Sequence, residues 1–111
     1  MITYSVTVTV DLDVQNKWLE WMLTHHIPEV LKTGFFSSCN LLQVVEPAPD
    51  NNKIVFNVRY ECDTLDAYRN YKEREAPRLQ AEHEKAFEGM FTVRRELLLP
   101  LKQPYTQVIK D

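Results

Sequence analysis

The chain has 111 residues, of which 44% are apolar and 26% are charged. This length suits one hydrophobic core, and this balance is typical of a globular protein rather than a disordered or fibrous one. The net charge of −3 gives no general attraction to nucleic acid or to an anionic membrane, so neither is expected as a partner.

The N-terminal segment alternates in polarity from residue 2 to residue 12, with an apolar side chain at every even position. This period of two predicts a strand. The segment lacks the basic start of a signal peptide and the continuous apolar run of a membrane span, so a cytoplasmic location is expected. The cysteines Cys39 and Cys62 have no metal-ligand spacing and are expected to be small buried hydrophobes.

A helix is predicted after this strand, with Asp13 as a candidate N-cap and Val14 as its first residue. At about 100° per residue, one face of this helix carries Val14, Trp18, Trp21, Met22 and His25. Pro28 removes a backbone donor and disfavours the αR conformation at Ile27, so the helix is expected to kink or restart there. Gly34 is expected to end it.

Two more strands are predicted, over residues 35–46 and 53–62, joined by the loop PAPDNN. Thr64 is a candidate cap for a second helical region, which Pro77 is expected to kink or restart and Gly89 to end. The apolar side of that region carries Leu65, Tyr68, Ala76, Leu79, His83 and Phe87. The last strand, over residues 91–101, is predicted to turn inward Phe91, Val93, Leu97, Leu99 and Leu101.

This order of elements predicts an α+β domain over residues 1–101 with a ferredoxin-like βαββαβ fold, followed by a C-terminal tail over residues 102–111. The four strands are expected to form an antiparallel sheet with both helices on one face. The other face carries threonines, Val55, Leu98 and the opposite charges Arg94 and Glu61, which can pair across a sheet. Such a face can meet water, but we expect a second copy to cover it in a homodimer.

Two segments, HHIPEVLKTGFF and APRLQAEHEKAFEGMFTVRR, resemble a bacterial family of proteins of about 100 residues described only as a domain of unknown function. The pattern combines, in order, His25, His26, Pro28, Gly34, Tyr68, Ala76, Pro77, Glu82, His83, Phe87 and Arg95. That family is similar to the dimeric α/β-barrel superfamily, with its antibiotic-biosynthesis monooxygenases, muconolactone isomerases and stress-responsive proteins. The resemblance implies two sheets facing one another in a homodimer, with a cleft between each sheet and its helices. It transfers no catalytic residue.

Histidines and aromatic residues are the candidate ligand-binding side chains, namely Trp18, Trp21, His25, His26, Tyr68 and His83. His25 is the best candidate for a catalytic acid or base, because histidine titrates near neutral pH. The simpler interpretation is a core histidine bonded to a carbonyl that Pro28 frees. On the other face, Arg59 and Arg94 can hold a carboxylate or pair with Glu61 and Glu96.

No metal or other cofactor is expected, because adjacent His25 and His26 diverge by about 100° on a helix and no third ligand accompanies them. Motifs for dinucleotides, phosphates, serine hydrolysis and zincins are absent from the sequence. The strand over residues 53–62 has Val55 and Asn57 where RNA-recognition domains carry stacking aromatics, which argues against RNA binding.

Three functions remain open. The first is a homodimer that binds a small organic molecule, aromatic or apolar, in the cleft between helices and sheet. The alternatives are a cofactor-independent enzyme of the monooxygenase or isomerase kind, and a structural or regulatory interaction module that uses the dimer surface and the tail. The sequence does not decide among ligands or physiological roles.

Overall fold

The alternating N-terminal segment forms β1 (Ile2–Asp11), a central strand in this computed structural model, which describes residues 1–101. It pairs antiparallel with β3 (Lys53–Cys62) on one side and with β4 (Phe91–Leu98) on the other. Because β2 (Ser38–Gln43) pairs with β3, the strand order is β2-β3-β1-β4. The predicted ferredoxin-like antiparallel sheet is confirmed.

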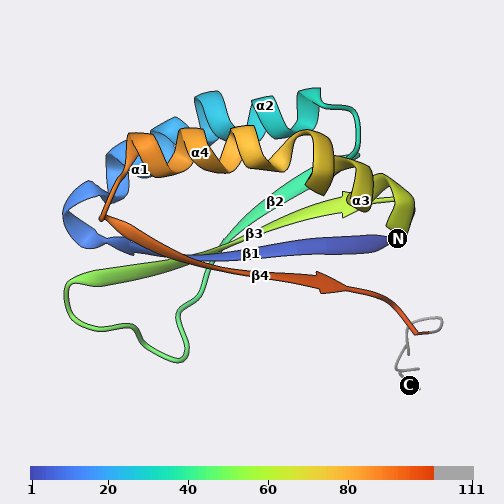
Figure 1. The fold of residues 1–111 in the computed structure, drawn as a ribbon. Helices are drawn as coiled ribbons and strands as arrows, with labels where there is room; N and C mark the ends of the chain where they lie inside the picture. Colours follow the sequence, from blue (N-terminus) through green and yellow to red (C-terminus); the bar gives the residue numbers. More distant parts are fainter. Residues whose placement is uncertain (102–111) are drawn as a thin grey trace, which may run out of the picture.

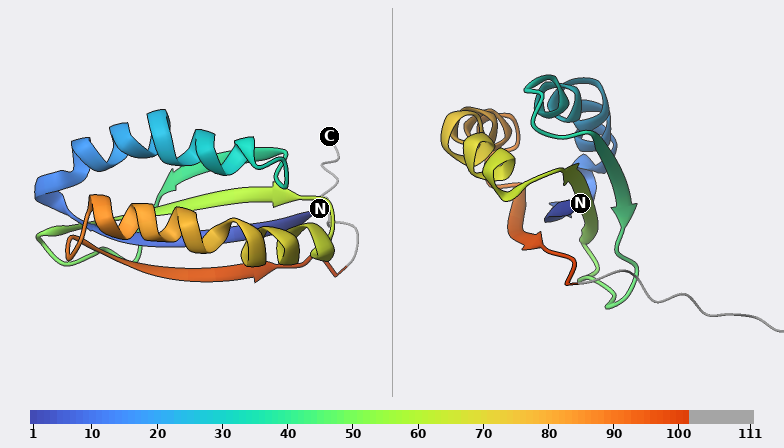
Figure 2. Two further views of the ribbon diagram at one scale, coloured as in Figure 1. Left: turned by 45° about the horizontal axis from the view of Figure 1, so that its top comes forward. Right: turned by 90° about the vertical axis from the view of Figure 1, so that its right-hand side faces the viewer.

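Two helical regions lie on one face of this sheet, and the opposite face carries no helix from residues 1–101 (Figure 1, Figure 2). The first region consists of η1 (Leu12–Val14), α1 (Gln15–Trp21), the π-helical turn η2 (Met22–His26) and α2 (Ile27–Lys32). The second region consists of α3 (Leu65–Arg74) and α4 (Ala76–Ala86). Helices on a single face leave the other face of the sheet open to solvent or to a partner.

The helix starts follow the predictions in the second region but not in the first. Thr64 caps α3, because its Oγ1 accepts a hydrogen bond from the Ala67 amide at 3.1 Å. Pro77 lies in the first turn of α4, so the expected restart is confirmed. The prediction that Asp13 caps a helix is wrong. The chain enters α1 through the 3₁₀ turn η1, which contains Asp13, and no side chain caps either element.

The helix also restarts near Pro28, as α2, but not in the expected way. Ile27 keeps the αR conformation, with φ −61° and ψ −46°, so the prediction that Pro28 displaces it is wrong. The chain reaches α2 through the π-helical turn, whose i→i+5 bonds insert one extra residue. The insertion rotates the inward face by one position, so His26 rather than His25 turns toward the sheet. Gly34, at φ 84°, ends the region as predicted.

Both edge strands are shorter than predicted. β4 ends at Leu98, which pairs with Thr3 near the beginning of β1, so little of β1 remains for later residues to pair with. The prediction that Leu99 and Leu101 face inward is wrong, since they are 53% and 94% exposed. Pro100 lies between them and has no backbone N–H to donate to a neighbouring strand. The predicted tail, residues 102–111, lies outside the described residues.

The charges on the open face pair differently from the predictions. Arg94 lies opposite Thr7 in the register and Glu61 opposite Thr3, so these two charges do not face one another across the sheet. Arg94 instead contacts Glu96 on its own strand, with Nε 3.5 Å from Oε1. The Thr3 hydroxyl donates to Glu61 at 2.8 Å.

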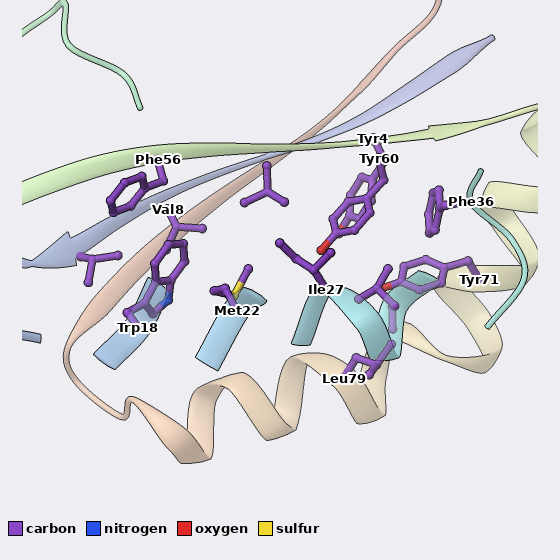
Figure 3. Packing of buried hydrophobic residues seen from close by; sticks show 14 of the residues in the cluster. Tyr4, Val8, Trp18, Met22, Ile27, Phe36, Phe56, Tyr60, Tyr71 and Leu79 are labelled. Carbon is purple, nitrogen blue, oxygen red and sulfur yellow. The ribbon is translucent and has the colours of Figure 1, made fainter. Parts of the chain in front are cut away.

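The core lies between the sheet and the helices (Figure 3). Trp18 is fully buried and stacks on Phe56, with ring centroids 5.0 Å apart. At the other end of the core, aromatic rings from three parts of the chain gather around Tyr4. The inward face predicted for β3 is confirmed, because every member is buried: Ile54, Phe56, Val58, Tyr60 and Cys62.

Replacing Thr64 by alanine tests the cap of α3. We expect Thr64→Ala to lower the free energy of unfolding by about 1 kcal/mol, because the Ala67 amide loses its acceptor. Asp13→Ala is the matched control and should change the free energy by less than about 0.5 kcal/mol. Urea unfolding followed by circular dichroism measures both, and equal losses in the two variants would contradict this assignment of the caps.

Candidate functional site

His83 is a buried member of α4, and its side chain is 4% exposed. The Trp18 indole Nε1 donates to His83 Nε2 over 3.0 Å. Because an indole N–H can only donate, Nε2 is the acceptor and the ring proton lies on Nδ1. Burial lowers the pKa of His83 to about 3, with a smaller contribution from His26 and Arg95, so the ring is neutral at pH 7.

Aromatic rings hold the His83 imidazole on several sides. Phe91 stacks on it with centroids 3.9 Å apart and an angle of 5° between the ring planes. Trp21 lies 5.5 Å away at 24°. With Trp18 packed against Phe56, this end of the space between helices and sheet is filled by side chains. Trp18 therefore belongs to the core rather than to an open pocket.

His26 is brought to the inside by the π-helical turn. Its ring stacks on Trp21 at 5.1 Å and lies 5.4 Å from His83. Its Nδ1 is buried and has no hydrogen-bond partner within residues 1–101. Burial lowers the pKa of His26 to about 4, although the nearby Glu82 charge opposes this effect. His26 is therefore a neutral group with one unused polar atom.

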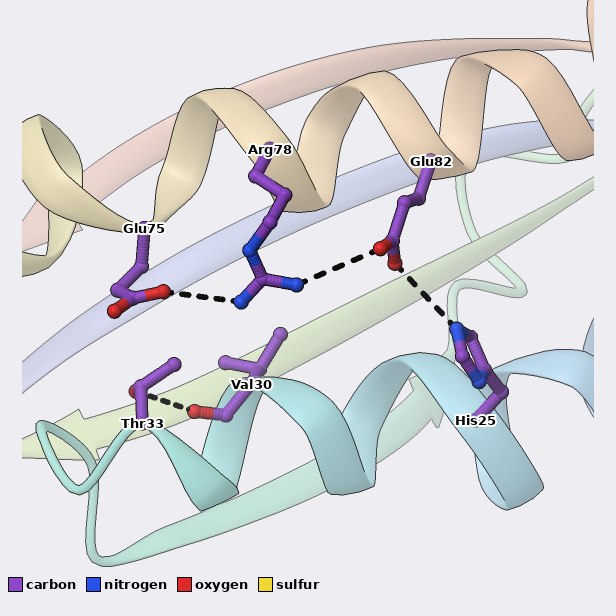
Figure 4. Close-up of polar contacts among 6 residues, drawn as sticks. All are labelled: His25, Val30, Thr33, Glu75, Arg78 and Glu82. Atoms are coloured by element: carbon purple, nitrogen blue, oxygen red, sulfur yellow. Dashed lines mark hydrogen bonds and ion pairs between the residues drawn. The ribbon is translucent and has the colours of Figure 1, made fainter.

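His25 lies outside this space, on the helix surface (Figure 4). Its side chain is 47% exposed, and Nε2 is 3.4 Å from Glu82 Oε2. Glu82 also contacts Arg78, which pairs with Glu75 at 3.0 Å. The prediction that His25 faces the sheet is wrong, because the π-helical turn gives that position to His26. Catalysis by His25 inside the cleft therefore has no geometric basis.

An open cleft adjoins this packed end, beside α4 and β4. A cavity of about 30 Å³ extends between helices and sheet, and its lining includes His26 and His83. A hollow of about 210 Å³ adjoins it, and its lining includes Tyr68. The two spaces share Tyr4, Tyr71, Gln80 and Arg95. We name the two spaces together the α4/β4 cleft, whose inner part is large enough for about one water molecule.

Arg95 is the functional candidate that the sequence reasoning missed. It lies on β4 opposite Val6 and lines both parts of the α4/β4 cleft. The signal was present, because Arg95 interrupts the inward series of Phe91, Val93 and Leu97 with a charge. Within residues 1–101, Arg95 forms no ion pair.

Burial raises the pKa of three tyrosines that line this cleft, Tyr4, Tyr68 and Tyr71. The positive charge of Arg95 opposes that effect at each of them. The inner cavity therefore combines one cation, Arg95, with tyrosine rings and neutral imidazoles. In the described part of the chain, no group of three or more His, Cys, Asp or Glu side chains is placed to hold a metal ion.

The open face of the sheet has a different character. Asn57 is buried there and donates to Ser5 Oγ at 2.9 Å and to Thr7 Oγ1 at 3.0 Å, while Arg59 donates to Asn57 Oδ1 at 2.7 Å. A hollow of about 760 Å³ lies between these strands and the β2–β3 loop, which includes Pro47. The expected pairing of Arg59 with Glu61 is replaced by the bond to Asn57.

This fold defines an α+β protein of the ferredoxin-like class, with a polar cleft beneath its helices. A model of the family described as Domain of unknown function (DUF4286) matches residues 1–100, and the chain belongs to that family. The resemblance noted in the sequence is thereby confirmed. A comparison with curated proteins finds no match. None of the helices formed by residues 1–101 has the length and apolar character that a membrane crossing requires.

Solved structures with the same fold are distant in sequence. A dimeric ferredoxin-like protein from an uncultured marine organism is 9% identical, with a TM-score of 0.66 over 96% of this chain and 100% of that chain. HapK from Hahella chejuensis is 14% identical, with a TM-score of 0.66 over 97% and 100%. A candidate antibiotic biosynthesis monooxygenase from Bacillus cereus is 17% identical, with a TM-score of 0.61 over 95% and 97%. At these identities the likeness shows the fold alone.

The two buried histidines predict a loss of stability in acid. Their pKa values in the folded chain are about 4 for His26 and about 3 for His83, below the ordinary value of 6.5 that the unfolded chain regains. Below pH 6.5 the unfolded chain therefore binds more protons than the folded chain. The free energy of unfolding should fall from pH 7 to pH 5, with a limiting slope of about 1.4 kcal/mol per pH unit for each histidine.

His83→Gln, whose side-chain oxygen can still accept from Trp18, should remove about half of this slope. His26→Gln should do the same independently, and the exposed His25→Gln is the control that should keep the full slope. Urea unfolding at several pH values measures each slope separately from the overall stability. An unchanged slope in both buried variants would show that these histidines are not neutral in the folded chain.

Proposed function

We propose that this protein is a homodimer that binds a small organic molecule in the α4/β4 cleft. The observation that carries the proposal is that the small inner cavity and the larger outer hollow are neighbours with four lining residues in common. Ligand sites are typically concave, mostly apolar and furnished with a few convergent polar groups. Here the polar groups are Arg95, Gln80 and His26, set among tyrosine rings.

The proposed site lies farther along the helix layer than the site predicted from the sequence. Trp18 and His25 leave the set, because one is packed in the core and the other lies on the surface. Trp21 also leaves it, because it lines neither part of the cleft. His26, Tyr68 and His83 stay in it, since each lines the cleft. The π-helical turn supports this choice, because such turns occur frequently at functional sites and this one orients His26 inward.

The homodimer is supported by the open face of the sheet. Leu42 and Leu98 are 47% and 40% exposed there, around the buried polar group of Ser5 and Asn57. Charges of both signs surround the hollow, including Arg94 and Glu96. A face that carries both signs can be complementary to itself across a two-fold axis. The fold is also shared with a protein described as dimeric.

Catalysis ranks second to binding. A general base works best when its pKa lies near the working pH. His26 and His83 have pKa values of about 4 and about 3, so at pH 7 they are weak bases and are almost never charged. Neutral imidazoles serve well as hydrogen-bond partners of a ligand, which favours the binding function over an acid–base reaction.

A fragment library tests the ligand site. We expect fragments to bind beside Tyr68, Gln80 and Arg95 in soaked crystals and to shift the amide signals of these residues in solution. Gln80→Trp should abolish binding by filling the cleft, because Gln80 lines both of its parts. The matched control is Ala81→Trp, since Ala81 is exposed on the same helix. Undiminished binding to Gln80→Trp would place the site elsewhere.

Analytical ultracentrifugation tests the dimer. The protein should sediment as a dimer at micromolar concentration, and Leu98→Glu should raise the dissociation constant by about tenfold or more, because it buries a charge in the interface. Leu23→Glu, at a leucine 58% exposed on the helical layer, is the control and should remain dimeric. A monomer from micromolar to millimolar concentration would rule out this assembly.

A further inference from the structure

The outer hollow of the α4/β4 cleft carries positive charge without a matching carboxylate. Arg95 and Lys72 both line it, and neither forms an ion pair within residues 1–101. Glu96 also lines it but already contacts Arg94, at 3.5 Å. A guanidinium beside apolar rings favours a planar anion such as a carboxylate, which it can hold through two parallel hydrogen bonds.

The walls of the hollow suit a flat, apolar body. Tyr4, Tyr68 and Tyr71 line it, with the Tyr4 ring centroid 5.2 Å from that of Tyr68 and 6.0 Å from that of Tyr71. Both ring pairs are tilted, at 55° and 56°, so the rings present faces and edges to the same space. Aromatic ligands pack well against such faces and edges.

The inner end of the cleft needs one polar group. His26 lines this end, its Nδ1 is buried without a partner within residues 1–101, and an unpaired buried polar atom costs about 1–3 kcal/mol. The cavity beside it, at about 30 Å³, admits a group the size of a water molecule or a hydroxyl. Because the ring is neutral, it can pair with a hydroxyl as either donor or acceptor, according to its tautomer.

From these three features we infer that the ligand is an aromatic carboxylate, with its carboxylate on Arg95 at the mouth and a hydroxyl group at its far end on His26. This inference rests on the proposed function, because it assigns a chemical class to the ligand of that cleft. Such a ligand has a polar group at each of two opposite ends, with an aromatic ring between them. A phosphate or an aliphatic acid satisfies only one of the three features.

Calorimetric titration with benzoate, its neutral isostere benzamide, 4-hydroxybenzoate and inorganic phosphate separates these contributions. Benzoate should bind at least tenfold more tightly than benzamide. Arg95→Gln should weaken the binding of benzoate by about tenfold or more and leave the affinity for benzamide unchanged. Arg69→Gln removes the same charge from the exposed surface of α3 and should leave the affinity for every probe unchanged. Phosphate should bind no more tightly than benzamide.

The hydroxyl group is tested by a double comparison. 4-Hydroxybenzoate should bind about threefold to tenfold more tightly than benzoate, and His26→Phe should abolish this difference but keep the binding of benzoate. Equal binding of benzoate and benzamide, or phosphate binding as tight as that of benzoate, would overturn the inference and leave the cleft as a ligand site. If no probe or fragment shifts the amide signals of the cleft residues, the proposed function itself is wrong.

Discussion

The hydrogen bond from Trp18 to His83 is the constraint on which the helical layer depends. A fully buried indole N–H needs an acceptor, and here the acceptor lies on the other helical region, 65 residues along the chain. The bond forms only while His83 Nε2 keeps its lone pair, so it requires a neutral ring. It therefore joins the packing of α1 against α4 to the protonation state of a histidine, and holds that histidine beside His26.

This arrangement divides the space beneath the helices into two unlike ends. Around Trp18 stacked rings fill the space, and the indole N–H is satisfied by His83, which borders the cavity. Around Tyr4 and Arg95 the side chains border open space, and within the described residues Arg95 forms no ion pair. A rigid end of this kind fixes the helix positions, and a binding site needs such support from its surroundings.

The two faces of the sheet differ in character. Its inner face sets the position of Arg95 through β4, while its outer face carries the hydrogen bonds of Asn57 and the hollow under the β2–β3 loop. Since side chains alternate across a strand, neighbours such as Arg94 and Arg95 serve opposite faces. The proposed association through one face and the proposed ligand binding beneath the other can therefore be tested by substitutions at different residues.

The sequence by itself determined the strands β1 and β3, the cap at Thr64 and the restart at Pro77, because these depend on side-chain alternation and on local hydrogen bonding. It also placed His26, Tyr68 and His83 among the candidates. Only the tertiary structure decided that His26 rather than His25 lies inside, since the π-helical turn shifts the helical phase by a residue that periodicity does not register. Likewise, the position of Arg95 beside Tyr4 and Gln80 depends on contacts between distant segments, which a local pattern does not specify.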